Sequence, residues 1–151
     1  MGQSAEAFLA DHELLTLATS SKSGEPHACS VFYATEGTTV FFSVPPGSVS
    51  HNNLSENARA SIAVGDAPDE GEDASAARGI QITGNVTDIE GDEEKAAGAK
   101  VAARYPYLGD VFSGGDFFRL DPTEVHYVHN DEDGDETFEA LGVTWKRETV
   151  Q

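Results

Sequence analysis

The chain has 151 residues, enough for one domain with a hydrophobic core. It carries 27 acidic and 9 basic residues, a formal net charge of −18. Its Lys and Arg residues are not clustered, which excludes a surface that binds nucleic acid through phosphates. Cys29 is the single cysteine, so no disulfide forms within the chain, and no apolar run suits export or membrane spanning. We therefore expect one cytoplasmic domain, residues 1–151, that binds neither nucleic acid nor a membrane.

The acidic excess also bears on the salt that the protein meets. Only four residues are lysines, and the carboxylates are spread over predicted loops and helix surfaces. They repel one another least in concentrated salt, where the Debye length is about 3 Å at 1 M against about 30 Å at 0.01 M. We infer the salt-rich cytoplasm of a halophile; an ordinary acidic protein is the alternative.

Helix caps and alternating strands divide the first half of the chain. Ser4 and Ser48 can each accept a hydrogen bond from the first turn of a helix, and Asn57 ends the second helix. The turn at 36–38 joins two apolar runs into a hairpin. In chain order we expect a helix at 4–12, strands at 14–20, 27–34 and 39–44, a helix at 48–57 and a strand at 59–66.

The second half begins with an acidic loop at 67–77. Ile80, Ile82 and Val86 then alternate with polar residues, as in a half-buried strand. A helix follows, because acids occupy its first turn and Pro106 helps to stop it. In chain order we expect a strand at 78–90, a helix at 91–106, strands at 117–121 and 124–130, and one more short strand within 137–148. Strands in hairpins with a few helices predict a mainly β fold, an antiparallel barrel with helical lids.

The stretch SVPPGSVSHNNLSENARASIAV, residues 43–64, places a run of polar residues at a helix start. Between Ser48 and Asn53, hydroxyl, imidazole and amide groups accompany backbone N–H groups that can point toward an anion. From Val44 to Ala58 there is no Lys or Arg. The polar run therefore indicates either a ligand site or a solvated helix cap.

Two motifs carry a resemblance to a known family. SVSHNNLSENARASI is similar to its polar turn followed by NL, NPR and a strand, and RGIQITGNV is similar to its strand with an Arg, an alternating run and a Gly. Over almost its whole length the chain resembles the FMN-binding split-barrel superfamily typified by pyridoxamine 5'-phosphate oxidase. The resemblance implies a six- to seven-stranded antiparallel split barrel with Greek-key topology and two or three short helices. It also implies a homodimer with two FMN sites at the subunit interface and a small-molecule substrate.

The resemblance also implies the residues of the flavin site. The phosphate would lie in the turn after the third strand, where typical members place Lys or Arg; in this chain Arg59 or Arg78 would have to reach it. Residues 27–32 would line the ring, and Trp145 either covers it or lies in the core. The candidate cofactor-binding residues are His27, Ala28, Cys29, Ser30, Phe32, Ser43, Ser48, Ser50, His51, Asn53, Arg78, Gln81 and Trp145.

Three other chemistries have weaker signals. His27 and Cys29 share a strand face, but nothing orients the imidazole for a nucleophile, and a lone cysteine usually packs in the core. His126 and His129 are three residues apart on a strand and so point to opposite faces, which predicts no metal site. The segment DEDGDE at 131–136 lacks the Gly and the final Glu of a calcium loop.

The sequence thus predicts a flavoprotein, an oxidoreductase whose chemistry belongs to bound FMN, and it identifies no catalytic residue. Two alternatives stay open: a non-catalytic flavin-binding or stress-related protein, and the same barrel with a deazaflavin or haem. Oxidation of pyridoxamine phosphate itself is not expected, because a phosphorylated substrate needs a cationic clamp and the C-terminal segment offers only Lys146 and Arg147.

Overall fold

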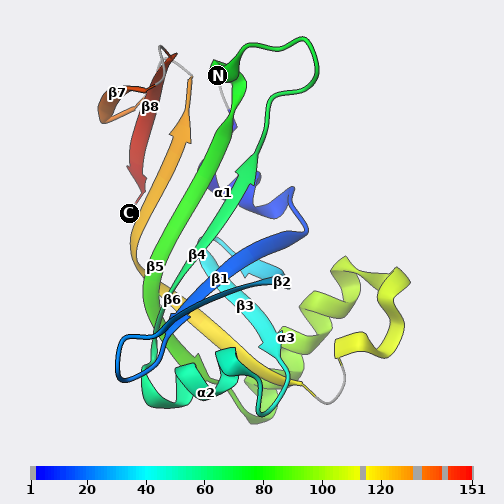
Figure 1. The fold of residues 1–151 in the computed structure, drawn as a ribbon. Helices are drawn as coiled ribbons and strands as arrows, with labels where there is room; N and C mark the ends of the chain where they lie inside the picture. Colours follow the sequence, from blue (N-terminus) through cyan, green and yellow to red (C-terminus); the bar gives the residue numbers. More distant parts are fainter. Residues whose placement is uncertain (1–2, 113–114, 131–133, 141–142, 151) are drawn as a thin grey trace.

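The computed structural model describes residues 3–112, 115–130, 134–140 and 143–150. One antiparallel sheet contains all the strands of this part of the chain (Figure 1). The strands are β1 (Leu14–Ser20), β2 (Pro26–Glu36), β3 (Thr39–Val44), β4 (Arg59–Asp66), β5 (Arg78–Asp88), β6 (Asp116–His129), β7 (Glu136–Ala140) and β8 (Val143–Val150). The helices are α1 (Ala5–Ala10), α2 (Val49–Glu56) and α3 (Gly91–Arg104), with short 3-10 segments η1 (Ala74–Ala76) and η2 (Pro106–Phe112).

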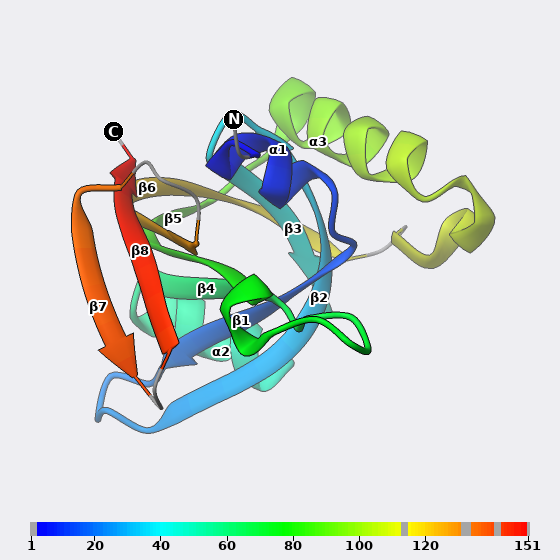
Figure 2. The ribbon, with the colours of Figure 1, turned by 90° about the horizontal axis from the view of Figure 1, so that it is seen from above.

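Six of these strands close into a barrel. Their order is β3-β2-β1-β4-β5-β6, and the pairing of β3 with β6 completes the ring. Because β4 returns beside β1 rather than beside β3, the topology is a Greek key. The predicted mainly β, antiparallel split barrel is confirmed. Beyond the barrel, β8 pairs with β6 and β7 pairs with β8, so that a hairpin extends the sheet (orange and red in Figure 2).

The structure corrects two sequence predictions in the second half. The strands expected at 117–121 and 124–130 are one continuous strand, β6, because Pro122 falls where the register with β5 shifts between Thr83 and Gly84. A proline has no N–H to donate, and an irregularity in the ladder accommodates it. The single strand expected within 137–148 is instead the hairpin of β7 and β8.

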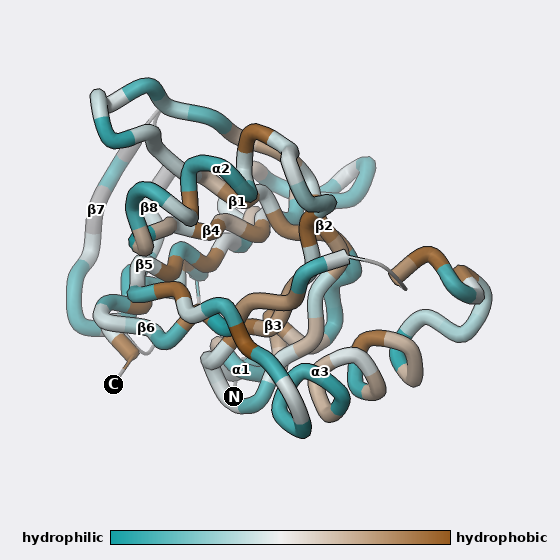
Figure 3. The backbone as a smooth tube through the Cα atoms, turned by 90° about the horizontal axis from the view of Figure 1, so that it is seen from below, coloured by the Kyte–Doolittle hydropathy of each residue, from teal (hydrophilic) through white to brown (hydrophobic). Residues whose placement is uncertain are grey.

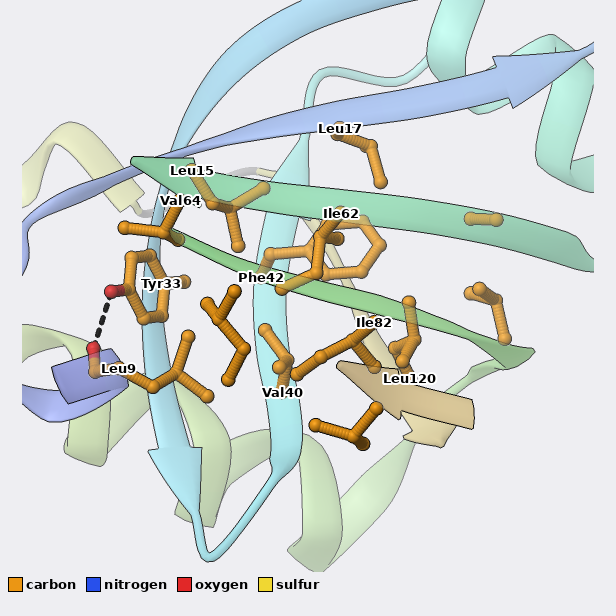
Figure 4. Packing of buried hydrophobic residues seen from close by; sticks show 14 of the residues in the cluster. Leu9, Leu15, Leu17, Tyr33, Val40, Phe42, Ile62, Val64, Ile82 and Leu120 are labelled. Atoms are coloured by element: carbon orange, nitrogen blue, oxygen red, sulfur yellow. Dashed lines mark hydrogen bonds between the residues drawn. The ribbon is translucent and has the colours of Figure 1, made fainter. Parts of the chain in front are cut away.

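The barrel interior is filled by alternate residues of its strands. Apolar side chains from every strand of the barrel meet there with Leu9 of α1 (Figure 4). A second cluster lies outside the barrel, where α3 packs on β2, β3 and β6; it includes Phe41, Val101, Tyr105 and Phe117. The side chains of the strands therefore face two separate cores.

The helices take different positions around the barrel. Helix α2 lies across its lower end, whereas α3 and the segment after it extend beside it and away from it (Figures 1 and 3). Ser4 and Ser48 cap α1 and α2 as predicted, each accepting a hydrogen bond from a backbone N–H of the first turn. In the part of the chain that the structure describes, no helix combines the length and apolar character needed to span a bilayer.

Tyr33 gives the fold a dependence on alkaline pH. Its ring is buried, and its hydroxyl donates a hydrogen bond to the carbonyl of Leu9 (Figure 4). Burial raises the pKa of Tyr33 to about 12, although the nearby Arg104 opposes the rise. The unfolded phenol ionises from about pH 10 and the folded one only near 12, so stability is full below pH 10 and is lost above it.

We expect the free energy of unfolding to fall by up to about 3 kcal/mol between pH 10 and 12 because of this one group. Urea unfolding of the wild type and of Tyr33→Phe, measured at several pH values from 9 to 11.5, tests the expectation. The variant should lose stability less steeply above pH 10. Equal slopes for the two proteins would contradict it.

Candidate functional site

A hollow opens on the outer side of β2 and β3, and it contains three of the predicted site residues. Along β2 the side chains alternate: Cys29 packs against the inner core, whereas Ser30 is exposed on the opposite side. We call this hollow of about 340 Å³ the β2–β3 hollow. Its lining residues are Ser30, Val31, Phe32, Ser43, Pro45, Pro46, Val111, Phe112 and Gly115.

A second hollow of about 320 Å³ lies between the start of β5 and β8, and it contains three more predicted residues. We call it the β5–β8 hollow; it is lined by Ala77, Arg78, Gly79, Gln81, Val128 and Trp145. Nη1 of Arg78 lies 3.3 to 3.5 Å from the carbonyl oxygens of residues 75–77, and these contacts hold the guanidinium over η1. Trp145 is half-buried and lines the hollow, so it is not a core residue.

The polar residues of α2 form a seam against the barrel. The side chains of Ser50 and Asn53 are 3% and 6% exposed. Sγ of Cys29 lies 3.1 Å from Oγ of Ser50, and Nδ2 of Asn53 donates to Oγ1 of Thr19 over 3.1 Å. Buried polar groups need such partners. These contacts explain why a helix with few apolar residues packs on the barrel end.

His51 is held by a hydrogen bond with Asp116 across the same end of the barrel. Its Nε2 lies 2.6 Å from Oδ2 of Asp116, at the start of β6. A neutral imidazole has one N–H donor. If the N–H of Nε2 donates a hydrogen bond to the carboxylate, Nδ1 can only accept one. A phosphate near His51 would also meet the negative charge of Asp116. Together with the seam, this geometry gives Ser50, His51 and Asn53 partners within the subunit; their contact with a phosphate stays a prediction.

The structure therefore divides the predicted site instead of gathering it. Ser30, Phe32 and Ser43 meet in the β2–β3 hollow, and Arg78, Gln81 and Trp145 meet in the β5–β8 hollow. The remaining candidates lie along β2 or on α2 and line neither hollow; they are His27, Ala28, Cys29, Ser48, Ser50, His51 and Asn53.

Sequence reasoning missed several lining residues. Pro45 and Pro46 form the wall where β3 ends, and Phe112 and Gly115 come from the distant segment around η2. The Pro-Pro-Gly turn was a usable signal for the first pair, since a rigid turn fixes the wall beside a strand end. No local pattern marks the second pair, because their place depends on how the chain returns from α3.

The geometry does not favour Cys29 as a nucleophile or a metal site among the described residues. Cys29 contacts Ser50 and packs against the inner core, and it has no imidazole among its hydrogen-bond partners. Within residues 3–112, 115–130, 134–140 and 143–150, no group of three or more His, Cys, Asp or Glu residues could hold a metal ion. The segment DEDGDE begins at 131–133, which lie outside the described residues.

Comparison with known proteins fits this architecture. The family model described as pyridoxamine 5'-phosphate oxidase matches residues 1–129. The chain belongs to this family. In this member of the pyridoxamine 5'-phosphate oxidase family, the match ends at His129, the last residue of β6. The matched part therefore contains the whole barrel and excludes the hairpin of β7 and β8. A search of curated proteins gives no significant match.

Solved structures share the fold of this family member at low sequence identity. A heme binding protein from Mycobacterium smegmatis superposes with a TM-score of 0.76 at 24% identity, over 99% of this chain and 59% of that one. The heme storage protein HutZ from Vibrio cholerae gives 0.60 at 18% identity, over 75% and 84%. An FAD-binding protein from Mesorhizobium loti gives 0.65 at 16% identity, over 95% and 89%. This family member thus spans 59% of the length of the M. smegmatis protein.

Proposed function

We propose that the chain is a cytoplasmic homodimer that binds FMN at the subunit interface and transfers electrons or hydride between the flavin and a small-molecule substrate. The division of the predicted site into two hollows is the observation that carries the proposal. The β2–β3 hollow and the β5–β8 hollow share no lining residue. A single flavin would contact both sets of lining residues if it lay between the β2–β3 hollow of one subunit and the β5–β8 hollow of its partner.

The chemistry of the two hollows is complementary. The β2–β3 hollow has the hydroxyls of Ser30 and Ser43 beside the ring of Phe32, which suits a flat, polar-edged ring system. It has no Lys or Arg, and neither does the chain from Val44 to Ala58. The β5–β8 hollow has Arg78, a guanidinium suited to a phosphate. The partner subunit's Arg78 would therefore supply the cation that the turn after β3 lacks.

Within this arrangement the protein's part is to bind and orient. Bound FMN would supply the electron-transfer chemistry. Trp145 and Phe32 would shield the ring from water, and the backbone of β2 would fix its plane. A flavin that no nicotinamide donor reduces would assign the chain to the non-catalytic flavin-binding class instead.

Mixing two site variants tests the shared site directly. Ser30→Trp fills the β2–β3 hollow, and Arg78→Gln removes the cation of the β5–β8 hollow, so each homodimer should lose FMN binding. In an equal mixture about half of the dimers are mixed, and one of the two sites in each has both hollows intact. We therefore expect the mixture to recover about a quarter of the wild-type FMN stoichiometry after unfolding and refolding together. Fluorescence titration in molar salt measures it.

Two surface variants serve as matched controls for this experiment. Ser23→Trp places the same bulk in an exposed turn, and Arg147→Gln removes a guanidinium that pairs with Glu136 on an exposed surface. Both should bind FMN as the wild type does. A mixture that stays without FMN would show that the site lies within one subunit, and a chain that is monomeric in light scattering would show the same.

Haem is the second candidate cofactor, and the position of one histidine favours it. His126 lies opposite Gln81 in the register of β5 and β6, beside the β5–β8 hollow, and its Nε2 contacts Glu124; released from that carboxylate, the imidazole could bind iron. Two proteins of the same fold are a heme binding protein and a heme storage protein. Titration with haem in place of FMN distinguishes the two candidates: a Soret band that His126→Ala removes would assign haem. Tight binding of a deazaflavin alone would assign that cofactor.

A further inference from the structure

A third hollow lies on the outer face of the barrel, across β1, β4 and β5. It has a volume of about 300 Å³ and shares no lining residue with either hollow of the proposed flavin site. Its polar lining consists of the hydroxyl groups of Ser20, Ser61 and Thr83 and the guanidinium of Arg59, whereas the hydroxyl of the buried Thr19 accepts from Asn53 in the seam. We call it the Arg59 groove.

The guanidinium of Arg59 is oriented by neutral groups. Nη1 donates to Oδ1 of Asn85 over 3.1 Å, and Nη2 lies 3.5 Å from Oγ1 of Thr123. Thr123 in turn donates its hydroxyl to the carbonyl of Thr83, so its oxygen presents a lone pair to the arginine. A guanidinium has five N–H donors, and these contacts use two of them. Three donors of Arg59 thus remain for a ligand, within the described residues.

Arg59 differs in this respect from Arg119 and Arg147. Arg119 pairs with Glu93 and Asp121, and Arg147 pairs with Glu136. Among the described residues no carboxylate lies within ion-pair distance of Arg59, although the chain has 27 acidic residues. Because no described carboxylate pairs with it, the guanidinium of Arg59 can pair with an external anion.

The surroundings of the groove favour an anion as well. Oγ of Ser61 and Oγ1 of Thr83 lie 2.7 Å apart, so one of the two hydroxyls keeps its proton free to donate into the groove. Of the carboxylates on the adjoining part of β6, Asp121 pairs with Arg119, and Glu124, which lies opposite Thr83 in the register, contacts His126.

We propose that the Arg59 groove binds the phosphoryl group of a small molecule. A phosphoryl group has three acceptor oxygens in a tetrahedral arrangement, which suits a guanidinium together with hydroxyls from neighbouring strands. The groove shares no lining residue with either flavin hollow, and competition with FMN tests whether it binds phosphate separately from the flavin.

Titration with inorganic phosphate, followed by NMR of the ¹⁵N-labelled chain at constant ionic strength, tests the proposal. Saturable shifts should be confined to Ser20, Arg59, Ser61 and Thr83. Arg59→Gln should weaken binding at least about tenfold, because it removes the charge-assisted hydrogen bonds. Ser61→Ala should weaken it less, since it leaves the guanidinium in place. Arg147→Gln is the matched control and should bind phosphate as the wild type does.

The same titration is repeated with glycerol phosphate, with acetate and with FMN-loaded protein. Tighter binding of glycerol phosphate than of phosphate would assign the groove to a phosphate ester, and equal binding would assign it to phosphate itself. Saturation at these residues by acetate but not by phosphate would overturn the proposal. Shifts scattered over the surface, or unchanged affinity in Arg59→Gln, would also overturn it. Competition between phosphate and FMN would place the groove in the flavin site and overturn its independence, whereas failure to bind FMN leaves the phosphate result intact.

Discussion

Gly84→Ala is expected to lower the free energy of unfolding by about 3 kcal/mol or more, the upper part of the range for overpacked positions. A Cβ at this position would lie 2.1 Å from the carbonyl oxygen of Asp121, 2.8 Å from its carbonyl carbon and 3.0 Å from Cα of Pro122. These are backbone atoms, so no side chain can turn aside. The clash falls at the register shift between β5 and β6, and relieving it requires the two strands to separate. Urea unfolding monitored by circular dichroism measures the loss.

Gly98→Ala is the matched control, because the same methyl group is added where there is room. Its Cβ would lie 3.7 to 3.8 Å from the ring of Phe117, an ordinary contact. Gly98 is inside α3, where alanine is a better helix former by about 0.5 to 1 kcal/mol. This variant should therefore be as stable as the wild type or more stable. A Gly84→Ala protein with wild-type stability would show that the close approach of β5 and β6 at the register shift does not require glycine at position 84.

Arg104→Met is expected to cost about 3 kcal/mol of stability, the upper value for hydrogen bonds of a charged group. The guanidinium donates to the carbonyls of Tyr33, Ala10 and His12, and so joins the end of α3 to β2, to the end of α1 and to the segment after α1. It also lies over the ring of Tyr33, 4.7 Å from its centroid. Methionine keeps much of the apolar stem but leaves three carbonyls without this donor.

Two further variants separate charge from geometry at this position. Arg104→Lys keeps the charge but cannot reach several carbonyls with a rigid fork, so most of the loss should persist. Arg147→Met removes an arginine that pairs with Glu136 on an exposed surface, and its effect should stay within about 0.5 kcal/mol. If Arg104→Lys unfolds like the wild type, Arg104 stabilises the fold through its charge alone.

The sequence predicted the first half of the fold closely because each element there has a local signal. The helix expected at 48–57 is α2 at Val49–Glu56, with Ser48 as its cap and Asn57 at its end. The cap residues and the alternating strands depend on contacts within a few positions. In the second half the strands expected at 117–121 and 124–130 are one strand, because the facing Gly84 accommodates Pro122. That compensation comes from another strand and leaves no trace near Pro122 in the sequence.

Six of the predicted residues line the two hollows, but their division between the hollows was not predictable from the sequence. The alternation of β2 indicates that Ser30 and Phe32 differ in facing from Cys29, and the structure agrees. The polar run on α2 indicated either a ligand site or a solvated helix cap, and in the structure Ser50 and Asn53 lie inward and contact Cys29 and Thr19. A hydroxyl or amide beside a helix start serves a ligand or a packing contact equally well, and only the direction of the helix decides between them.

Strand β6 has a consequence for the order in which the chain folds during synthesis. It pairs with β5 along most of its length, with β3 at its start and with β8 at its end. A ribosome delivers β1 to β5 first, and until residues 116–129 emerge, β3 and β5 are the two open edges of an unfinished sheet. Such edges can pair with other nascent chains, and this barrel cannot cover them by local contacts. The nascent protein is thus exposed to misassembly until its last barrel strand is made, and closure protects both edges in one step.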